Sequence, residues 1–199
     1  KAALAFAGVA LFDPAKDSKG FGGILQVTTA REIDTLQILA DRQTPLGTLP
    51  GAAIEASQIN GFGAKRVVLG GTMAASGGNE PSVSIYAANS GVILRSGATL
   101  RAPEIVLTAR DGGTGELVEQ GATITTVGQG GPGFDSSDGY YFSTRDSAFV
   151  VSNGWVNLLP SQGATKPTID IGGCQSANGC TGTTRILSEG TIGAATNGA

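Results

Sequence analysis

The sequence predicts an all-β fold, a parallel β-helix whose short strands stack into coils and whose Gly-rich inserts project as loops. Glycine occupies 32 of 199 positions and separates short runs rich in Val, Ile, Leu and Thr, which is typical of strands bounded by tight turns. A weak internal repeat of roughly 20 to 25 residues is typical of a solenoid, whose units bury a core only by stacking. The absence of a Gly-X-Y period excludes collagen.

The strand regions share one pattern, in which an apolar-alternating run is followed by a Gly or Asn turn and another run. In chain order we expect them at 23–39, 52–71, 82–109, 116–127, 148–159, 168–172 and 185–193. Alternation at Val83 and Ile85 predicts that one side of each strand faces inward. The Gly-rich segments 71–80 and 128–139 are expected to be long loops between coils.

The repeat is carried by Gly-Ala-Thr at Gly97, Gly121 and Gly163, with a relative at Gly190. Gly97 and Gly121 lie 24 residues apart, and we interpret the longer gap to Gly163 as two periods. At this period the chain would form about eight or nine coils, stacked about 4.8 Å apart. The alternative is an antiparallel barrel or sandwich, for which short turns such as Asn60-Gly61 and Asn153-Gly154 would be suitable.

The domain organisation is predicted to be simple, with a terminal edge segment at 1–20 and a single repeat region at 21–199 that is a fragment of a larger chain. The apolar stretch at 2–12 superficially resembles a signal peptide, but it has a thin basic region and no clear cleavage site. It is also too short to cross a membrane as a helix.

Cys174 and Cys180 are the two cysteines of the chain. Without histidine or a second cysteine pair they cannot complete a four-ligand zinc site. The Asn178-Gly179 turn between them favours a disulfide, which would indicate an oxidising compartment. Two free, buried thiols are the alternative.

A family resemblance rests on the order of several short motifs. These are RVVLGGT at 66–72, PSVSIYAANSGVIL at 81–94, LRAPEIVLTA at 100–109, GATI at 121–124 and FVVSNG at 149–154. In this order they resemble the C-terminal domain of unknown function of filamentous haemagglutinin family outer-membrane proteins, over about residues 50–199. The resemblance implies a right-handed parallel β-helix exported to the bacterial cell surface by two-partner secretion. Its implied partner is an outer-membrane secretion transporter, and its implied role is that of an adhesin or a toxin stalk.

Acidic residues suggest two kinds of ionic site. The stretch 130–138, GGPGFDSSD, resembles one calcium-binding β-roll nonapeptide, and Asp135, Asp138 and Asp146 carry suitable oxygens. The motif occurs once and lacks its apolar anchor, so we interpret it as a loop with no metal.

Acidic pairs in β-helix polysaccharide lyases and hydrolases suggest a list of candidates: Glu55, Glu104, Glu116, Glu119 and Asp170. We interpret Glu116 and Glu119 as solvated loop charges and Glu104 as a charge at a strand edge.

Three aromatic residues, Trp155, Tyr140 and Tyr141, are candidates for stacking on sugar rings or anchoring a protein partner. The alternative is that Trp155 covers an apolar edge and the tyrosines pack beneath the 128–139 loop.

No histidine is present to activate a serine or cysteine nucleophile. A net charge of −3 argues against a nucleic-acid or membrane-surface partner. We therefore expect a non-enzymatic structural or adhesive segment without a cofactor, which contacts a host or neighbouring-cell protein or glycan. A carbohydrate-active β-helix enzyme and a glycan-binding module are the alternatives.

Overall fold

The structure is a computed structural model that describes residues 23–75, 82–132, 139–165, 167–176 and 178–196. This part of the chain forms seventeen strands and one short helix, arranged in four sheets. The all-β class predicted from the sequence is therefore confirmed. The predicted edge segment 1–20 and the Asp135 and Asp138 positions of the calcium candidate lie outside the described residues.

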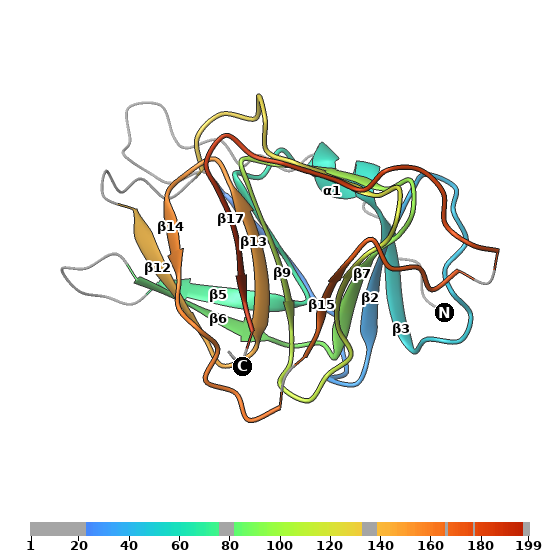
Figure 1. Ribbon diagram of the computed structural model, residues 1–199, viewed down its shortest axis with the longest axis horizontal. Coiled ribbons are helices and arrows are strands. Elements are labelled where there is room, and N and C mark those ends of the chain that lie inside the picture. Colours follow the sequence, from blue (N-terminus) through green and yellow to red (C-terminus); the bar gives the residue numbers. More distant parts are fainter. Residues whose placement is uncertain (1–22, 76–81, 133–138, 166, 177, 197–199) are drawn as a thin grey trace.

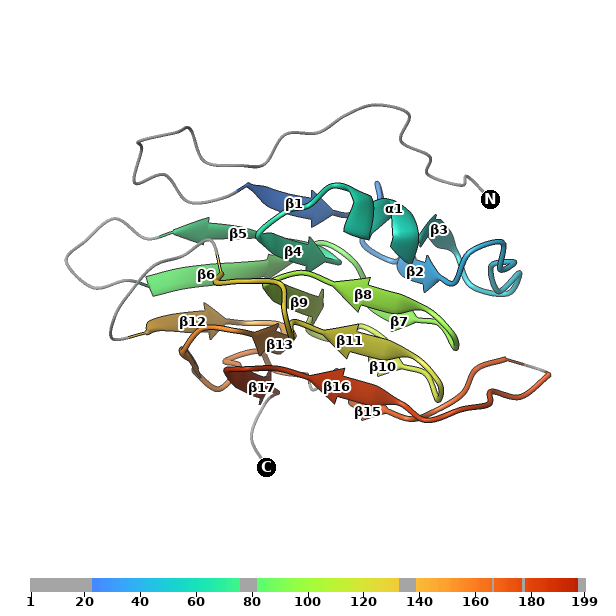
Figure 2. The same cartoon turned by 90° about the horizontal axis from the view of Figure 1, so that it is seen from above.

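The first sheet is entirely parallel and has the order β15-β10-β7-β2-β3. Its strands are Ile169–Ile171, Gly115–Val118, Gly91–Leu94, Thr35–Leu39 and Gly51–Glu55, in the same order. The second sheet, β16-β11-β8, is also parallel and comprises Arg185–Leu187, Thr123–Thr125 and Thr99–Arg101. In Figure 2 the strands of these two sheets lie in rows, one row above the next.

The third sheet mixes strand directions. It comprises β1 (Ile24–Val27), β4 (Arg66–Leu69), β9 (Glu104–Ala109), β13 (Ser147–Ser152) and β17 (Thr191–Ala195). The first three are parallel, whereas β13 runs antiparallel to both β9 and β17. Uniform parallel stacking is therefore wrong at β13. The reason is local, because only Arg145 and Asp146 join β12 to β13, and so short a link makes the chain turn back.

The fourth sheet packs on one face of the third (Figure 1). It comprises β14 (Val156–Leu158), β12 (Tyr140–Thr144), β6 (Ser82–Ala87) and β5 (Gly71–Ala75), with β5 antiparallel to β6. One of these strands, β5, lies in the segment 71–80 that is predicted above to be a loop. The strands of the fourth sheet take up residues that the prediction assigned to further coils. The coils are therefore fewer than the predicted eight or nine, and none of the described sheets holds more than five strands.

Two cores lie on opposite faces of the third sheet, and we call them the inner core and the outer core. Alternate residues of β4, β9 and β13 point to each, so that Ile105 and Leu107 enter the inner core while Val106 enters the outer core. Each of these strands is consequently buried along its whole length. The inner core lies between the first three sheets, and the outer core lies between the third and fourth.

The chain visits the first three sheets in a recurring order. The units β7-β8-β9, β10-β11-β13 and β15-β16-β17 each contribute one strand to the first, second and third sheet in turn. Gly91 pairs with Gly115 and Thr99 with Thr123, so the 24-residue spacing of the first two Gly-Ala-Thr motifs is one structural repeat. The third Gly-Ala-Thr motif, at Gly163, does not continue this stack of repeats. The strand that pairs with β11 on the side away from β8 is β16, in which Arg185 lies opposite Thr123.

The one described helix, α1 (Ala56–Gly61), replaces the strand and turn expected at Asn60-Gly61. Its buried Ala56 and Ile59 close the inner core at this end of the molecule. The Asn60 side chain donates to the carbonyl of Thr99 and accepts from the N–H of Arg101, at 2.8 Å each. A neighbouring strand would satisfy these same groups of β8, so the helix covers the edge of the second sheet.

Candidate functional site

Glu104 lies at the start of β9 in the middle of the third sheet and is fully buried, so its predicted place at an exposed strand edge is wrong. Its carboxylate is paired with the Arg66 guanidinium and accepts hydrogen bonds from the hydroxyls of Tyr140 and Ser152. Arg66 also donates to the Tyr140 oxygen at 2.9 Å. Burial and the adjacent Glu104 charge raise the pKa of the Tyr140 phenol, so the phenol remains the donor.

Glu119 is also fully buried and is not the solvated loop charge that we predicted. It follows β10, as Arg95 follows β7, so the two residues occupy equivalent places in successive units, 24 residues apart. Their side chains form a salt bridge of 2.9 Å. The same carboxylate accepts the backbone N–H groups of Ser96 and Gln175, at 2.8 and 3.0 Å. Glu119 therefore ties three successive passes of the chain together.

Glu116 on β10 is buried without a basic partner among the described residues, which also contradicts the predicted solvated position. The Ser147 hydroxyl lies 2.7 and 2.8 Å from its two oxygens. Burial raises the pKa of the Glu116 carboxyl to about 8, and the Ser147 hydrogen bond offsets part of this effect. Near neutral pH this carboxyl is consequently largely protonated.

The remaining two acidic candidates are far apart. Glu55 ends β3 and Asp170 lies in β15, and these strands are the two outer members of the first sheet. Four strand spacings separate them, about 19 Å at about 4.8 Å per spacing. A glycosidase pair needs carboxyl groups about 5 to 9.5 Å apart. The five acidic candidates therefore include no pair that both faces solvent and has this spacing.

The three aromatic candidates divide by exposure. Trp155, between β13 and β14, is 69% exposed and Tyr141 is 42% exposed, whereas Tyr140 is buried against Phe142. Tyr140 is therefore wrong as a surface aromatic, because alternate residues of β12 point to opposite faces and its hydroxyl belongs to the Glu104 network. Trp155 borders a depression of about 510 Å³ that Asn157 and Ile192 also line.

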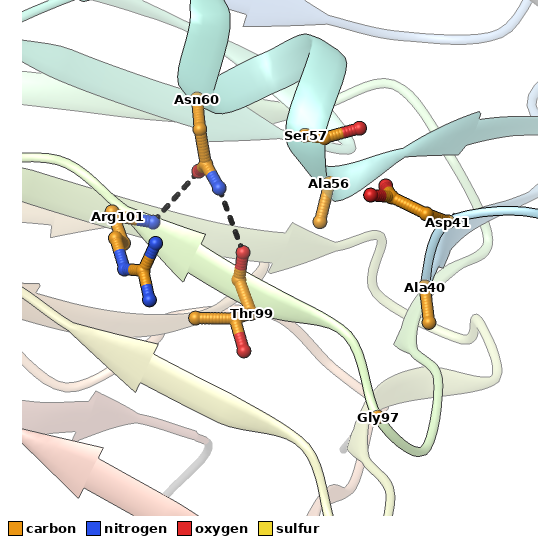
Figure 3. A pocket seen from close by; sticks show the side chains of 8 residues that line it. All are labelled: Ala40, Asp41, Ala56, Ser57, Asn60, Gly97, Thr99 and Arg101. Atoms are coloured by element: carbon orange, nitrogen blue, oxygen red, sulfur yellow. Dashed lines mark hydrogen bonds between the residues drawn. The ribbon is translucent and has the colours of Figure 1, made fainter.

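A second depression, of about 400 Å³, lies beside α1 and is drawn in Figure 3. The Asp41 carboxylate lies on one side of it and the Arg101 guanidinium on the other, with Asn60 and Thr99 between them. Both amide atoms of Asn60 are occupied by the backbone of β8. No sequence pattern predicts this depression, because Asp41, Arg101 and α1 come from three separate segments and form no local motif.

The disulfide between Cys174 and Cys180 is confirmed, with an S–S distance of 2.08 Å. It closes a loop between β15 and β16. Ligand atoms of Glu119 and the two cysteines lie within 4.8 Å of one another. The disulfide occupies both sulfurs, so they are not thiolate ligands in this state.

Comparison with profiles of known protein families, with curated proteins and with solved structures finds no match for this chain. Among the described helices, none has the length and apolar character needed to cross a membrane.

Proposed function

We propose that this chain is a structural segment of a right-handed parallel β-helix, whose role is to be a stiff support and not a catalyst. The observation that carries this proposal is the recurrence of one three-strand unit, whose first two strands repeat at a spacing of 24 residues between the units that begin with β7 and β10. Gly91 and Gly115, Arg95 and Glu119, and Leu100 and Ile124 occupy equivalent places in adjacent units. Such an arrangement satisfies the backbone of each unit with that of its neighbours.

The buried ion pairs support a mechanical role. Arg95–Glu119 and Arg66–Glu104 each join different passes of the chain and lie away from solvent. A buried pair of this kind resists separation, because removing either partner would leave an uncompensated charge in the interior. The antiparallel strands β13 and β5 then belong to excursions that widen the support by adding the fourth sheet and the outer core.

The biological setting follows from the motif resemblance, and we propose it on that ground. The chain would be part of a filamentous haemagglutinin-like exoprotein, delivered to the cell surface by a two-partner secretion transporter, where it would extend an adhesin or a toxin stalk. The Cys174–Cys180 disulfide is compatible with this oxidising, extracellular location.

Glycan binding is the second candidate function, and the exposure of Trp155 favours it. A large aromatic surface beside the Asn157 amide is a combination that suits a sugar ring, which has an apolar face and polar edges. Tyr140 contributes nothing to such a site, since it is buried. A polysaccharide-cleaving activity has less support, because the acidic candidates do not form an accessible pair.

Stiffness can be measured directly. Thr48 and Thr183 are exposed residues in loops far apart in the chain, and cysteines introduced there can be spin-labelled while the native disulfide stays oxidised. We expect a narrow, single-peaked distance distribution by pulsed electron paramagnetic resonance, and a broad one would contradict the structural role. A glycan-array screen combined with a reducing-sugar release assay distinguishes the alternatives, since a support gives neither signal and a lectin gives only the first.

A further inference from the structure

The strands β15, β16 and β17 form one end of the molecule, which we call the open end. They lie along the lower margin of Figure 2, opposite β1 and α1. Each pairs on one side with a strand of the preceding unit, and no described strand pairs with its other side. Three rows of backbone N–H and C=O groups are therefore available to another strand.

No described residue covers the inner core at the open end. Ile171 pairs with Val118 and Ile192 with Val151, so both isoleucines point toward the inner core. Val118 and Val151 have 0% exposure, whereas Ile171 and Ile192 are 47% and 50% exposed. Among the described residues they form the last layer of the inner core at this end.

More apolar surface flanks this layer. Leu187 on β16, Leu159 after β14 and Trp155 before β14 are all between 44% and 69% exposed. Half of the large exposed apolar residues in the described chain thus belong to the segment from Trp155 to Ile192. A concentration of exposed apolar side chains beside unpaired strand edges indicates a surface that another molecule covers.

At the opposite end β1 and β3 are outer strands that pair with no further described strand, but the row of the second sheet is closed. There α1 covers the edge of β8 through Asn60, and Ile59, which is 1% exposed, closes the inner core. Head-to-tail stacking of two copies would leave β16 facing a helix that presents no strand edge. The open end of one copy therefore fits the open end of another better than it fits α1.

We propose that two copies of this chain associate through their open ends about a two-fold axis, with the strands of the two copies antiparallel. If the two-fold axis crosses the middle of β17 at a right angle, β17 of one copy lies against β17 of the other. The same axis then places β15 of one copy against β16 of the other. In the register that sets Ile169 opposite Ile186, both inward-facing, Asp170 lies opposite Arg185. These are the charged residues of β15 and β16 and both are exposed, so the pairing is complementary in charge as well as in shape. This inference goes beyond the structural role and concerns the 199-residue chain by itself, since a following coil of a longer β-helix would cover the same strands.

The experiment is sedimentation equilibrium of the oxidised 199-residue chain, from 1 to 300 μM. We expect a reversible monomer–dimer equilibrium. Ile192→Lys puts a charge into the last core layer and should weaken dimerisation at least tenfold. Ile33→Lys, at an isoleucine that is 66% exposed outside the open end, is the matched control and should leave the equilibrium unchanged.

Charge exchange tests the register. Asp170→Arg and Arg185→Asp should each weaken the dimer, and the double variant should restore it. Circular dichroism confirms that each variant is folded. A monomer at every concentration, a polymer larger than a dimer, equal weakening by Ile33→Lys, or failure of the double variant to recover would each overturn the proposal.

Discussion

Replacing Glu116 by glutamine should make the protein more stable at neutral and alkaline pH. The carboxyl is buried, its hydrogen-bond partner is the hydroxyl of Ser147, and the nearby Asp146 charge adds a smaller unfavourable effect. The folded protein therefore holds a proton that the unfolded chain releases at lower pH. Glutamine keeps the shape and the hydrogen-bonding capacity of the protonated acid but cannot ionise.

The sign and size follow from the pKa. It is about 8 in the folded protein against an ordinary value of 4.5. Below pH 4.5 the carboxyl is protonated in both the folded and the unfolded state, so its ionisation does not lower the free energy of unfolding. Between pH 4.5 and 8 the native state binds more protons than the unfolded state, so the free energy of unfolding falls as the pH rises. At about 1.4 kcal/mol per pH unit, the loss reaches roughly 5 kcal/mol above pH 8, an order-of-magnitude figure.

The assay is urea unfolding between pH 4 and 9.5, followed by circular dichroism and by Trp155 fluorescence, with the disulfide oxidised. Linear extrapolation gives the free energy of unfolding at each pH. The quantity that matters is the difference between variant and wild type, because all other titrating groups cancel in it. We expect a small, constant difference near pH 4 that grows in favour of Glu116→Gln up to about pH 8 and then levels off.

Glu189→Gln is the matched control, because it makes the same chemical change at an exposed glutamate. A difference curve for Glu116→Gln that stays flat from pH 5 to 8, or that favours wild type as the pH rises, would refute the reasoning. It would mean that the carboxyl is solvated or paired with a cation in solution.

Three further substitutions test the packing. Arg66→Met leaves the Glu104 carboxylate buried without its cation and should lower the free energy of unfolding by about 3 to 5 kcal/mol; in urea melts, a loss below about 1 kcal/mol would contradict a desolvated pair. Gly121 and Gly128 both have positive φ, but a Cβ at Gly121 would lie 2.0 Å from a backbone carbonyl oxygen while one at Gly128 meets nothing within 4 Å. Gly121→Ala should therefore cost at least about 2 kcal/mol more than Gly128→Ala, and equal melting temperatures would count against the close approach. Asn60→Ala removes two hydrogen bonds from the edge of β8 and should cost about 1 to 3 kcal/mol, with faster hydrogen exchange at the Arg101 amide; unchanged exchange there would exclude the capping role.

The sequence alone determined the all-β class, the disulfide and one structural repeat, because each depends on local patterns. Glycine-bounded apolar runs specify most of the strands, with α1 inside the run 52–71 as the exception. A six-residue separation with an Asn-Gly turn brings the two cysteines together through local geometry. The 24-residue spacing of Gly97 and Gly121 is likewise visible in one dimension, and the same spacing between Arg95 and Glu119 was a signal that could have revealed their salt bridge.

Only the tertiary structure decided which faces are buried and which way each strand runs. Glu104, Glu116 and Glu119 occupy positions that look like solvated strand ends, yet neighbouring units and the fourth sheet enclose them. Tyr140 and Tyr141 are adjacent in sequence, but alternation along β12 buries one and exposes the other. The direction of β13 and the depression at Asp41 and Arg101 depend on where separate segments meet. Long-range packing sets the burial of a charge and the partner of a strand, and no local pattern records either.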